Sequence, residues 1–234
     1  AVHRELQTPA AVKMLRHHLS MNREFKDSFK NEARIIAGLD REFLAAVFVS
    51  LKVAFLSTAL ATLAGVPFGM WIAERRGRGA RAIMTVLTTL MSLPTVVVGL
   101  MVYSFLSRRG PLGELGLLYT PAAMVIGQFI LAFPIVAGLS ASAVVGLDKR
   151  IRSTAYSLGA DTAQSFRMFL REARYGIMAA IMAGFGRVFA EVGVSMMLGG
   201  NIRGYTRNIT TAMALETSKG EFAFGIALGL VLLS

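Results

Sequence analysis

The feature that most constrains this chain is a set of long apolar runs that contain no charge. The first covers residues 53–73, "VAFLSTALATLAGVPFGMWIA", and two more cover residues 82–106 and 121–147. A helix of about twenty apolar residues crosses the hydrocarbon core of a bilayer. Each run contains one proline (Pro67, Pro94 and Pro134), which a membrane helix tolerates when neighbours satisfy the freed carbonyl. The sequence therefore predicts three spanning helices.

Two further runs extend this pattern. Residues 175–200 predict a fourth span, interrupted by Arg187 and Glu191. Phe222 to Leu233 is apolar but too short to cross, and we interpret it as a truncated fifth span. Residues 43–49 extend the first helix past Lys52. The expected fold class is an all-α membrane protein with about five spans.

Composition agrees and excludes several functions. The chain is 54% hydrophobic and 17% charged, which is typical of membrane proteins. It has no cysteine, and its three histidines lie within the first eighteen residues, so the apolar region lacks thiolate or imidazole metal ligands. There is no nucleophile elbow and no P-loop, so we expect no catalytic centre and no bound cofactor. The net charge of +11 comes in clusters between apolar runs, which favours membrane lipid over nucleic acid as a partner.

The amino-terminal region differs from the rest. In residues 25–42, apolar residues recur at helical spacing up to Gly38, which predicts an amphipathic helix lying in the membrane interface. Residues 1–24 are interpreted as a leader or tail, with Met21 as a candidate natural start. Residues 43–234 form the expected transmembrane domain.

The loops between the spans indicate orientation. Loops 74–81 and 148–174 hold four and six Lys/Arg, whereas loops 107–120 and 199–221 hold two and three. The excess of basic residues predicts that the first pair is cytoplasmic. Alternation of the spans then places the amino terminus outside, even though residues 1–42 hold eight Lys/Arg.

Arg187 and Glu191 are the only charges deep in the fourth span, and their spacing of four places them on one helix face. Ionisable groups at that depth face protein or water. The pair either lines a route for a charged solute or is a structural ion pair between helices. Small residues at spacing four (Gly176, Ala180 and Gly184; Gly225 and Gly229) indicate closely packed helices and are compatible with a dimer.

Loop 148–174 is unusually elaborate. A first short helix is expected over residues 149–158, ending at Gly159 as a left-handed cap. Asp161 or Thr162 then caps a second helix that contains Phe166, Phe169 and Leu170. Such a helical pair is either a docking element for another protein or a hairpin anchored on lipid by its arginines.

Two segments carry a family resemblance. "STAYSLGADTAQSFRMFLREA" resembles the EAA loop of ABC importer membrane subunits. Ser153, Thr154 and Ala155 stand at Glu-Ala-Ala, with the glutamate and first alanine replaced, and Gly159 stands at the glycine. "GRVFAEVGVSMMLGGNIRGYTRNITTAMALETSKGEF", residues 186–222, resembles molybdate, sulfate and, most closely, tungstate permeases. The first span with its lead-in also resembles the tungstate branch.

The resemblance implies a type I ABC importer permease that works as a homodimer in the inner membrane, with its amino terminus outside. Two ATP-binding subunits, which use ATP and Mg, would hold the coupling loop, and an extracytoplasmic binding protein would deliver the oxyanion. The implied coupling residues are Ser153, Ala155, Gly159, Ala160, Asp161, Phe166 and Arg167. The predicted contacts to the binding protein are Asn201, Arg203, Tyr205 and Arg207.

The expected function is thus the membrane subunit of a tungstate importer, with molybdate or sulfate as alternative cargo. The chain itself would not be an enzyme. A different class, the stand-alone secondary carrier, would require an internal repeat and an ion site near the membrane midplane, and the sequence shows no clear repeat.

Overall fold

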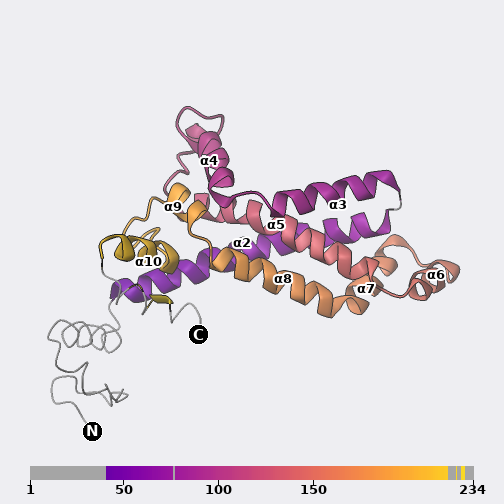
Figure 1. Ribbon diagram of the computed structural model, residues 1–234. Helices are drawn as coiled ribbons and strands as arrows, with labels where there is room; N and C mark the ends of the chain where they lie inside the picture. Colours follow the sequence, from indigo (N-terminus) through magenta and orange to yellow (C-terminus); the bar gives the residue numbers. More distant parts are fainter. Residues whose placement is uncertain (1–40, 76, 221–224, 226–227, 230–234) are drawn as a thin grey trace, which may run out of the picture. The chain divides into compact units, whose positions relative to one another are not determined.

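A computed structural model describes residues 41–75, 77–220, 225 and 228–229, and within these residues the secondary structure is helical. The elements are α2 (Arg41–Glu74), α3 (Arg78–Met91), α4 (Thr95–Leu106), η1 (Gly113–Leu115), α5 (Pro121–Val145), α6 (Lys149–Ser157), α7 (Thr162–Glu172), α8 (Arg174–Phe189), α9 (Gly193–Gly199) and α10 (Ile209–Ser218) (Figure 1). The chain divides into two compact units, residues 51–200 and residues 1–50 with 201–234. We call them the core unit and the terminal unit.

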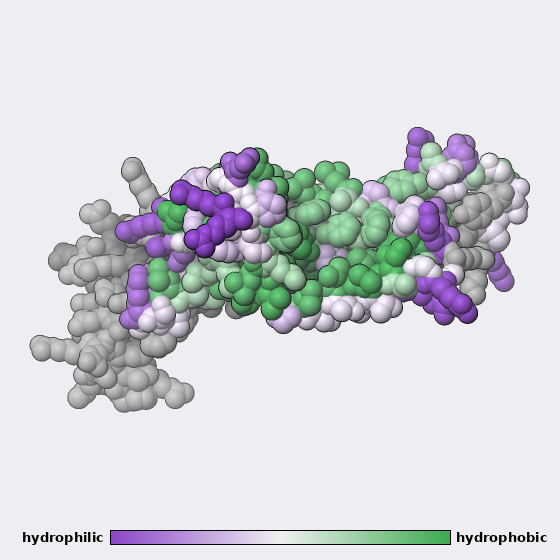
Figure 2. Space-filling view, turned by 90° about the horizontal axis from the view of Figure 1, so that it is seen from above, coloured by the Kyte–Doolittle hydropathy of each residue, from purple (hydrophilic) through white to green (hydrophobic). Residues whose placement is uncertain are grey.

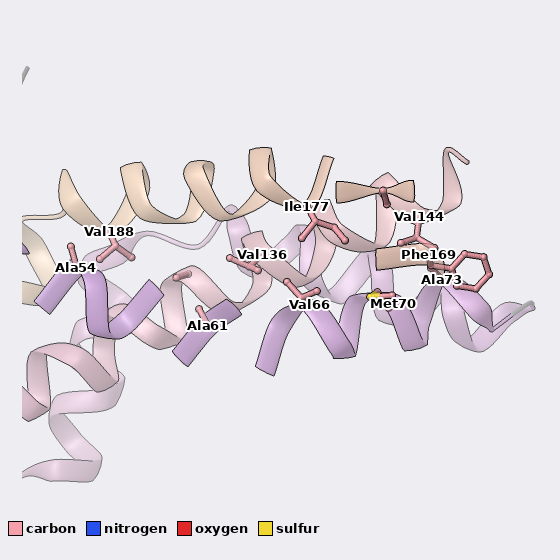
Figure 3. Close-up of a cluster of buried hydrophobic side chains, with 12 residues drawn as sticks. Ala54, Ala61, Val66, Met70, Ala73, Val136, Val144, Phe169, Ile177 and Val188 are labelled. Carbon is pink, nitrogen blue, oxygen red and sulfur yellow. The ribbon is translucent and has the colours of Figure 1, made fainter. Parts of the chain in front are cut away.

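A bundle of α2, α5 and α8 forms the centre of the core unit. Buried apolar side chains from these helices and from α7 make one continuous cluster along the bundle (Figure 3). Val188 lies beside Ala54 near one end, and Phe169 lies beside Ala73 at the other. The cluster therefore ties α7 directly to the ends of the long helices.

Small residues let these helices approach closely. A Cβ added to Gly69 of α2 would overlap the backbone carbonyl of Ala137 in α5. A Cβ on Gly184 of α8 would lie 2.8 Å from Val136 of α5, and one on Gly176 would lie 2.6 Å from Ala143. The small-residue face of α8 is therefore used for packing against α5 within one chain, and it gives no support to a dimer contact.

Two spans are unbroken, as predicted. Leu44–Glu74 and Pro121–Val145 are each long and apolar enough to cross a membrane. The first confirms the extension of the helix past Lys52, and both helices continue through their internal proline, Pro67 and Pro134.

The prediction of a continuous helix over residues 82–106 is wrong. This segment is α3 and α4, bent by 97°. Pro94 lacks an amide hydrogen and disfavours helical geometry at Leu93, so α3 ends and α4 starts anew at Thr95.

The fourth span predicted over residues 175–200 is not one continuous helix, because α8 and α9 are bent by 59°. The carboxylate of Glu191 accepts a hydrogen bond from the Val194 amide at 3.2 Å, which caps α9 as a separate helix. Counting each bent pair as one span gives up to four spans in the described residues.

The terminal unit corrects the interpretation of residues 199–221 as a loop. Asn208 and Thr211 form a reciprocal capping box at the start of α10. The Ile209 amide donates a hydrogen bond of 2.8 Å to the hydroxyl of Ser50, which joins α10 to α2. The leader 1–24, residues 25–40 of the predicted interfacial helix and most of the fifth apolar run lie outside the described residues; Arg41 onward belongs to α2.

Much of the outer surface of the core unit is apolar. Phe55, Leu63 and Met182 are 69%, 74% and 71% exposed. Figure 2 shows hydrophobic surface over the middle of the bundle and hydrophilic residues at the end that carries α6 and α7. A protein in water rarely exposes so much contiguous apolar surface, so this surface belongs against lipid or other spans.

Candidate functional site

The first candidate site is the hairpin formed by α6 and α7. Gly159 lies between the two helices with φ of +71°, which confirms the predicted left-handed cap. Asp161, the first of the two predicted caps, begins α7: its carboxylate accepts from the Gln164 amide at 2.7 Å, and the Gln164 side chain accepts from the Asp161 amide at 3.0 Å. The angle between the helices is therefore defined by local backbone geometry.

The inner face of α7 is fixed to the bundle. Phe169 is 1% exposed and belongs to the same buried cluster as Met70 and Ala73 at the end of α2. Phe166, predicted to offer its ring to a partner, is only partly exposed and packs against this cluster. A displacement of α7 would therefore move the ends of the spanning helices.

Much of the outer face of the hairpin is exposed. Ser153, Asp161 and Arg167 are exposed, Ala160 is half-buried, and the side chain of Ala155 lies outside the described set. Leu158 is 81% exposed and was missed by the sequence reasoning. An apolar side chain immediately before a cap glycine is the signal that could have identified it, since that position projects from the turn.

Aromatic and basic side chains mark the membrane boundary at this end. The Arg75 guanidinium lies 3.9 Å from the ring centre of Trp71 at the end of α2. Arg174 lies over the Tyr175 ring at 4.8 Å and donates a hydrogen bond of 3.2 Å to its hydroxyl at the start of α8. Trp, Tyr and basic residues gather at membrane interfaces, which favours a position of the hairpin just outside the bilayer.

The second candidate site is the ion pair at the break between α8 and α9. A guanidinium nitrogen of Arg187 lies 3.1 Å from a carboxylate oxygen of Glu191, and the two side chains are 41% and 3% exposed. A Cβ added to Gly193 would lie 3.3 Å from both the Glu191 carboxylate and the Thr95 hydroxyl. The breaks of the two bent spans therefore adjoin, with the acid buried and the base reaching outward.

A buried polar network was not predicted. The Gln128 amide in α5 donates to the Ser195 hydroxyl in α9 at 2.9 Å, and its oxygen accepts from the Ser57 hydroxyl in α2 at 3.4 Å. All three residues are at most 2% exposed. Their hydrogen bonds hold α9 against both long helices. The sequence signal that could have identified this network is the single side-chain amide of Gln128 inside an apolar run, because such a group requires buried hydrogen-bond partners.

The opposite end of the core unit is joined to α9 through Tyr119. Its amide donates to the Leu198 carbonyl at 2.9 Å. A hydrogen bond with the Tyr103 hydroxyl raises the pKa of Tyr119 above the ordinary value of a phenol.

In the terminal unit, the predicted docking residues do not share one environment. Arg203 and Tyr205 are exposed, whereas Asn201 and Arg207 are half-buried. The Asn201 amide contacts the Thr211 carbonyl at 3.5 Å, so this residue supports α10. Docking by the two exposed residues stays a prediction.

Comparison of the sequence with known proteins identifies the family of this chain. Residues 65–234 match the model of the binding-protein-dependent transport system inner membrane component. The chain belongs to this family. It is therefore a transporter subunit of the ABC permease class rather than an enzyme, and it is a membrane protein.

Individual relatives carry more specific names. The chain is 39% identical over 207 residues to the tungstate uptake system permease protein TupB of Peptoclostridium acidaminophilum, covering 88% of this chain and 91% of the relative. It is 40% identical to TupB of Campylobacter jejuni, covering 88% and 87%. The molybdenum transport system permease protein ModB of Azotobacter vinelandii is 30% identical, with 84% and 91% covered. The recognition of an oxyanion permease related to the tungstate branch is confirmed.

Proposed function

We propose that this chain is the membrane-spanning subunit of an ATP-driven tungstate importer and works as a homodimer. The observation that carries the proposal is the likeness to permeases named for tungstate, at 39–40% identity over 88% of the chain. The permease named for molybdenum stands at 30%. Molybdate is therefore the second candidate cargo and sulfate a more distant one.

Two ATP-binding subunits would hold the α6–α7 hairpin, and ATP and Mg would be bound in those partners. The exposed side of the hairpin supports this role, because Leu158 offers an apolar contact beside Gly159. Phe169 would transmit movement of the hairpin into the spans, as its ring packs on the end of α2. Alternating access would follow from rocking of the helices between two packings.

In this arrangement the hairpin is cytoplasmic and the amino terminus is outside. The basic loops 74–81 and 148–174 lie at the same end as the Trp71 and Tyr175 boundary, which supports that orientation. An extracytoplasmic binding protein would then dock at the other side. Arg203 and Tyr205 are the exposed residues suited to that contact.

The proposal is tested by uptake in proteoliposomes. The chain is reconstituted with its ATP-binding subunit and binding protein, and accumulation of tungstate, molybdate and sulfate is measured with and without ATP. We expect ATP-dependent accumulation of tungstate in preference to the other two anions. Preference for molybdate would refute the cargo but keep the transporter. Uptake by the chain reconstituted alone would favour a secondary carrier and refute the proposal.

A further inference from the structure

The polar residues of α3 are confined to one side of the helix. They are Arg78, Arg81, Thr85, Thr88, Thr89 and the adjoining Ser92. At 100° per residue they fall within an arc of about 100°. The remaining residues of α3 are Gly, Ala or larger apolar residues. We call the six residues the polar arc.

The middle of the apolar side of α3, at Leu87, faces the protein, its edge at Val86 and Leu90 is exposed, and the polar arc faces away from the protein. Leu87 is 3% exposed and packs with Ile72 of α2 and Ala137 of α5. All six residues of the polar arc are exposed. A helix that faced only lipid would carry apolar residues at the positions of the polar arc.

α3 lies at membrane depth rather than on the membrane surface. It runs alongside the spanning helix α5 (Figure 1). Leu87 contacts the second half of α5, and Leu93, at the break after α3, packs with a cluster that includes Leu131 near the middle of α5. The polar arc thus extends over about 20 Å, from the end that carries α6 to the level of the two breaks.

Lipid alone does not account for the polar arc. The Thr85, Thr88 and Thr89 hydroxyls donate to the carbonyls four residues earlier, so single threonines would be tolerated in lipid. Arg78 and Arg81 lie in the first turn of α3, next to the boundary marked by Trp71, where arginines reach the headgroups. The four hydroxyl residues that continue this face deeper into the membrane, Thr85, Thr88, Thr89 and Ser92, are all exposed opposite the buried Leu87, and such a polar face is typical of a helix that borders water. A groove of about 900 Å³ lies between α3 and the ends of α2 and α5; Arg81, Thr85 and Thr88 contribute polar groups on its α3 side, and the rest of its lining is mainly apolar.

We propose that the polar arc of α3 forms one wall of the water-filled route by which a tetrahedral oxyanion passes between the adjoining breaks and the α6–α7 end. The inference rests on the proposed function. Hydroxyl groups can rotate to donate to a passing anion, and the arginines at the mouth lower its electrostatic energy there. The route begins at the two breaks, near Thr95 and Glu191, and ends at the side that carries α6 and α7.

The chain contains no cysteine, so single cysteines can report on water access without removing others. Thr85→Cys, Thr88→Cys and Ser92→Cys probe the polar arc. Val86→Cys and Leu90→Cys are matched controls, because these residues are 57% and 41% exposed but lie on the apolar side. Each variant of the assembled complex is treated with the anionic thiol reagent 2-sulfonatoethyl methanethiosulfonate, and labelling is measured on this chain alone.

Cysteines on the polar arc should react at least about tenfold faster than the controls. Apolar surroundings raise the pKa of the control thiols, and a rise of one unit lowers the fraction of reactive thiolate about tenfold. The cationic 2-(trimethylammonium)ethyl reagent, with each rate normalised to a free thiol, should react less readily there than the anionic one. Adding Arg81→Gln to each polar-arc variant should slow labelling by the anionic reagent and should not slow labelling by the cationic one. Equal rates on both sides of α3, or no preference for the anion, would overturn the inference.

Uptake of tungstate by the unlabelled variants is measured separately, so the two proposals fail differently. Rapid labelling of the polar arc in a complex that carries no tungstate would refute the proposed function and support the water-filled route. Slow labelling in a complex that does carry tungstate would refute the route alone.

Discussion

At the scale of single residues, the Arg187–Glu191 pair is asymmetric. Glu191 is almost fully buried and also caps α9, whereas Arg187 is two-fifths exposed. Loss of the arginine leaves a buried carboxylate without that charge partner, and loss of the acid leaves a base that can still reach water. The sequence predicted the pair from its spacing but could not distinguish the two environments, which depend on the bend between α8 and α9.

We therefore expect Arg187→Leu to destabilise the protein by about 1–3 kcal/mol, the cost of leaving a buried polar group poorly paired. The double variant with Glu191→Gln should recover much of this loss, since the glutamine is uncharged and its oxygen can still accept from the Val194 amide. Thermal denaturation of the purified permease measures both. A double variant less stable than Arg187→Leu would show that the pair is not coupled in this way.

At the scale of helices, close packing depends on glycines that face a neighbour. Gly69 touches the backbone of α5, while Gly186 on α8 has nothing within 4 Å of an added Cβ. Long apolar runs sufficed to predict α2 and α5, because length and hydropathy decide whether a helix can span. The bends at Pro94 and Glu191 were not predicted, since a proline is tolerated in α2 and α5 but ends α3, and only tertiary contacts distinguish these cases.

Gly69→Ala should destabilise the core unit by about 1–3 kcal/mol through overpacking against the Ala137 carbonyl. Gly186→Ala serves as the matched control and should be neutral or slightly stabilising, because alanine favours an exposed helix. The midpoints of thermal unfolding of the two variants give the comparison. Equal midpoints would mean that α2 and α5 separate easily enough to admit the methyl group.

At the scale of the whole protein, packing contacts and hydrogen bonds connect the candidate sites of the core unit to one another. The hairpin carries Gly159 at its tip and is tied through Phe169 to the ends of the bundle. Gln128 ties the bundle to α9, which follows the ion pair and adjoins Thr95 at the start of α4. The local signals of the hairpin were readable in the sequence as a glycine cap and an aspartate cap. The Gln128 network was not, because its partners are 71 and 67 residues away.

The most direct test of this account is the number of tungstate ions transported per ATP hydrolysed by the complex with Gly159→Val or Gly159→Asn. An added Cβ meets nothing within 4 Å at φ of +71°, so valine acts only through backbone strain of about 1–2 kcal/mol, which asparagine largely avoids. We expect valine to lower the ratio or the association with the ATP-binding subunit, and asparagine to preserve both. An unchanged ratio and unchanged association for Gly159→Val would contradict a coupling role for the hairpin.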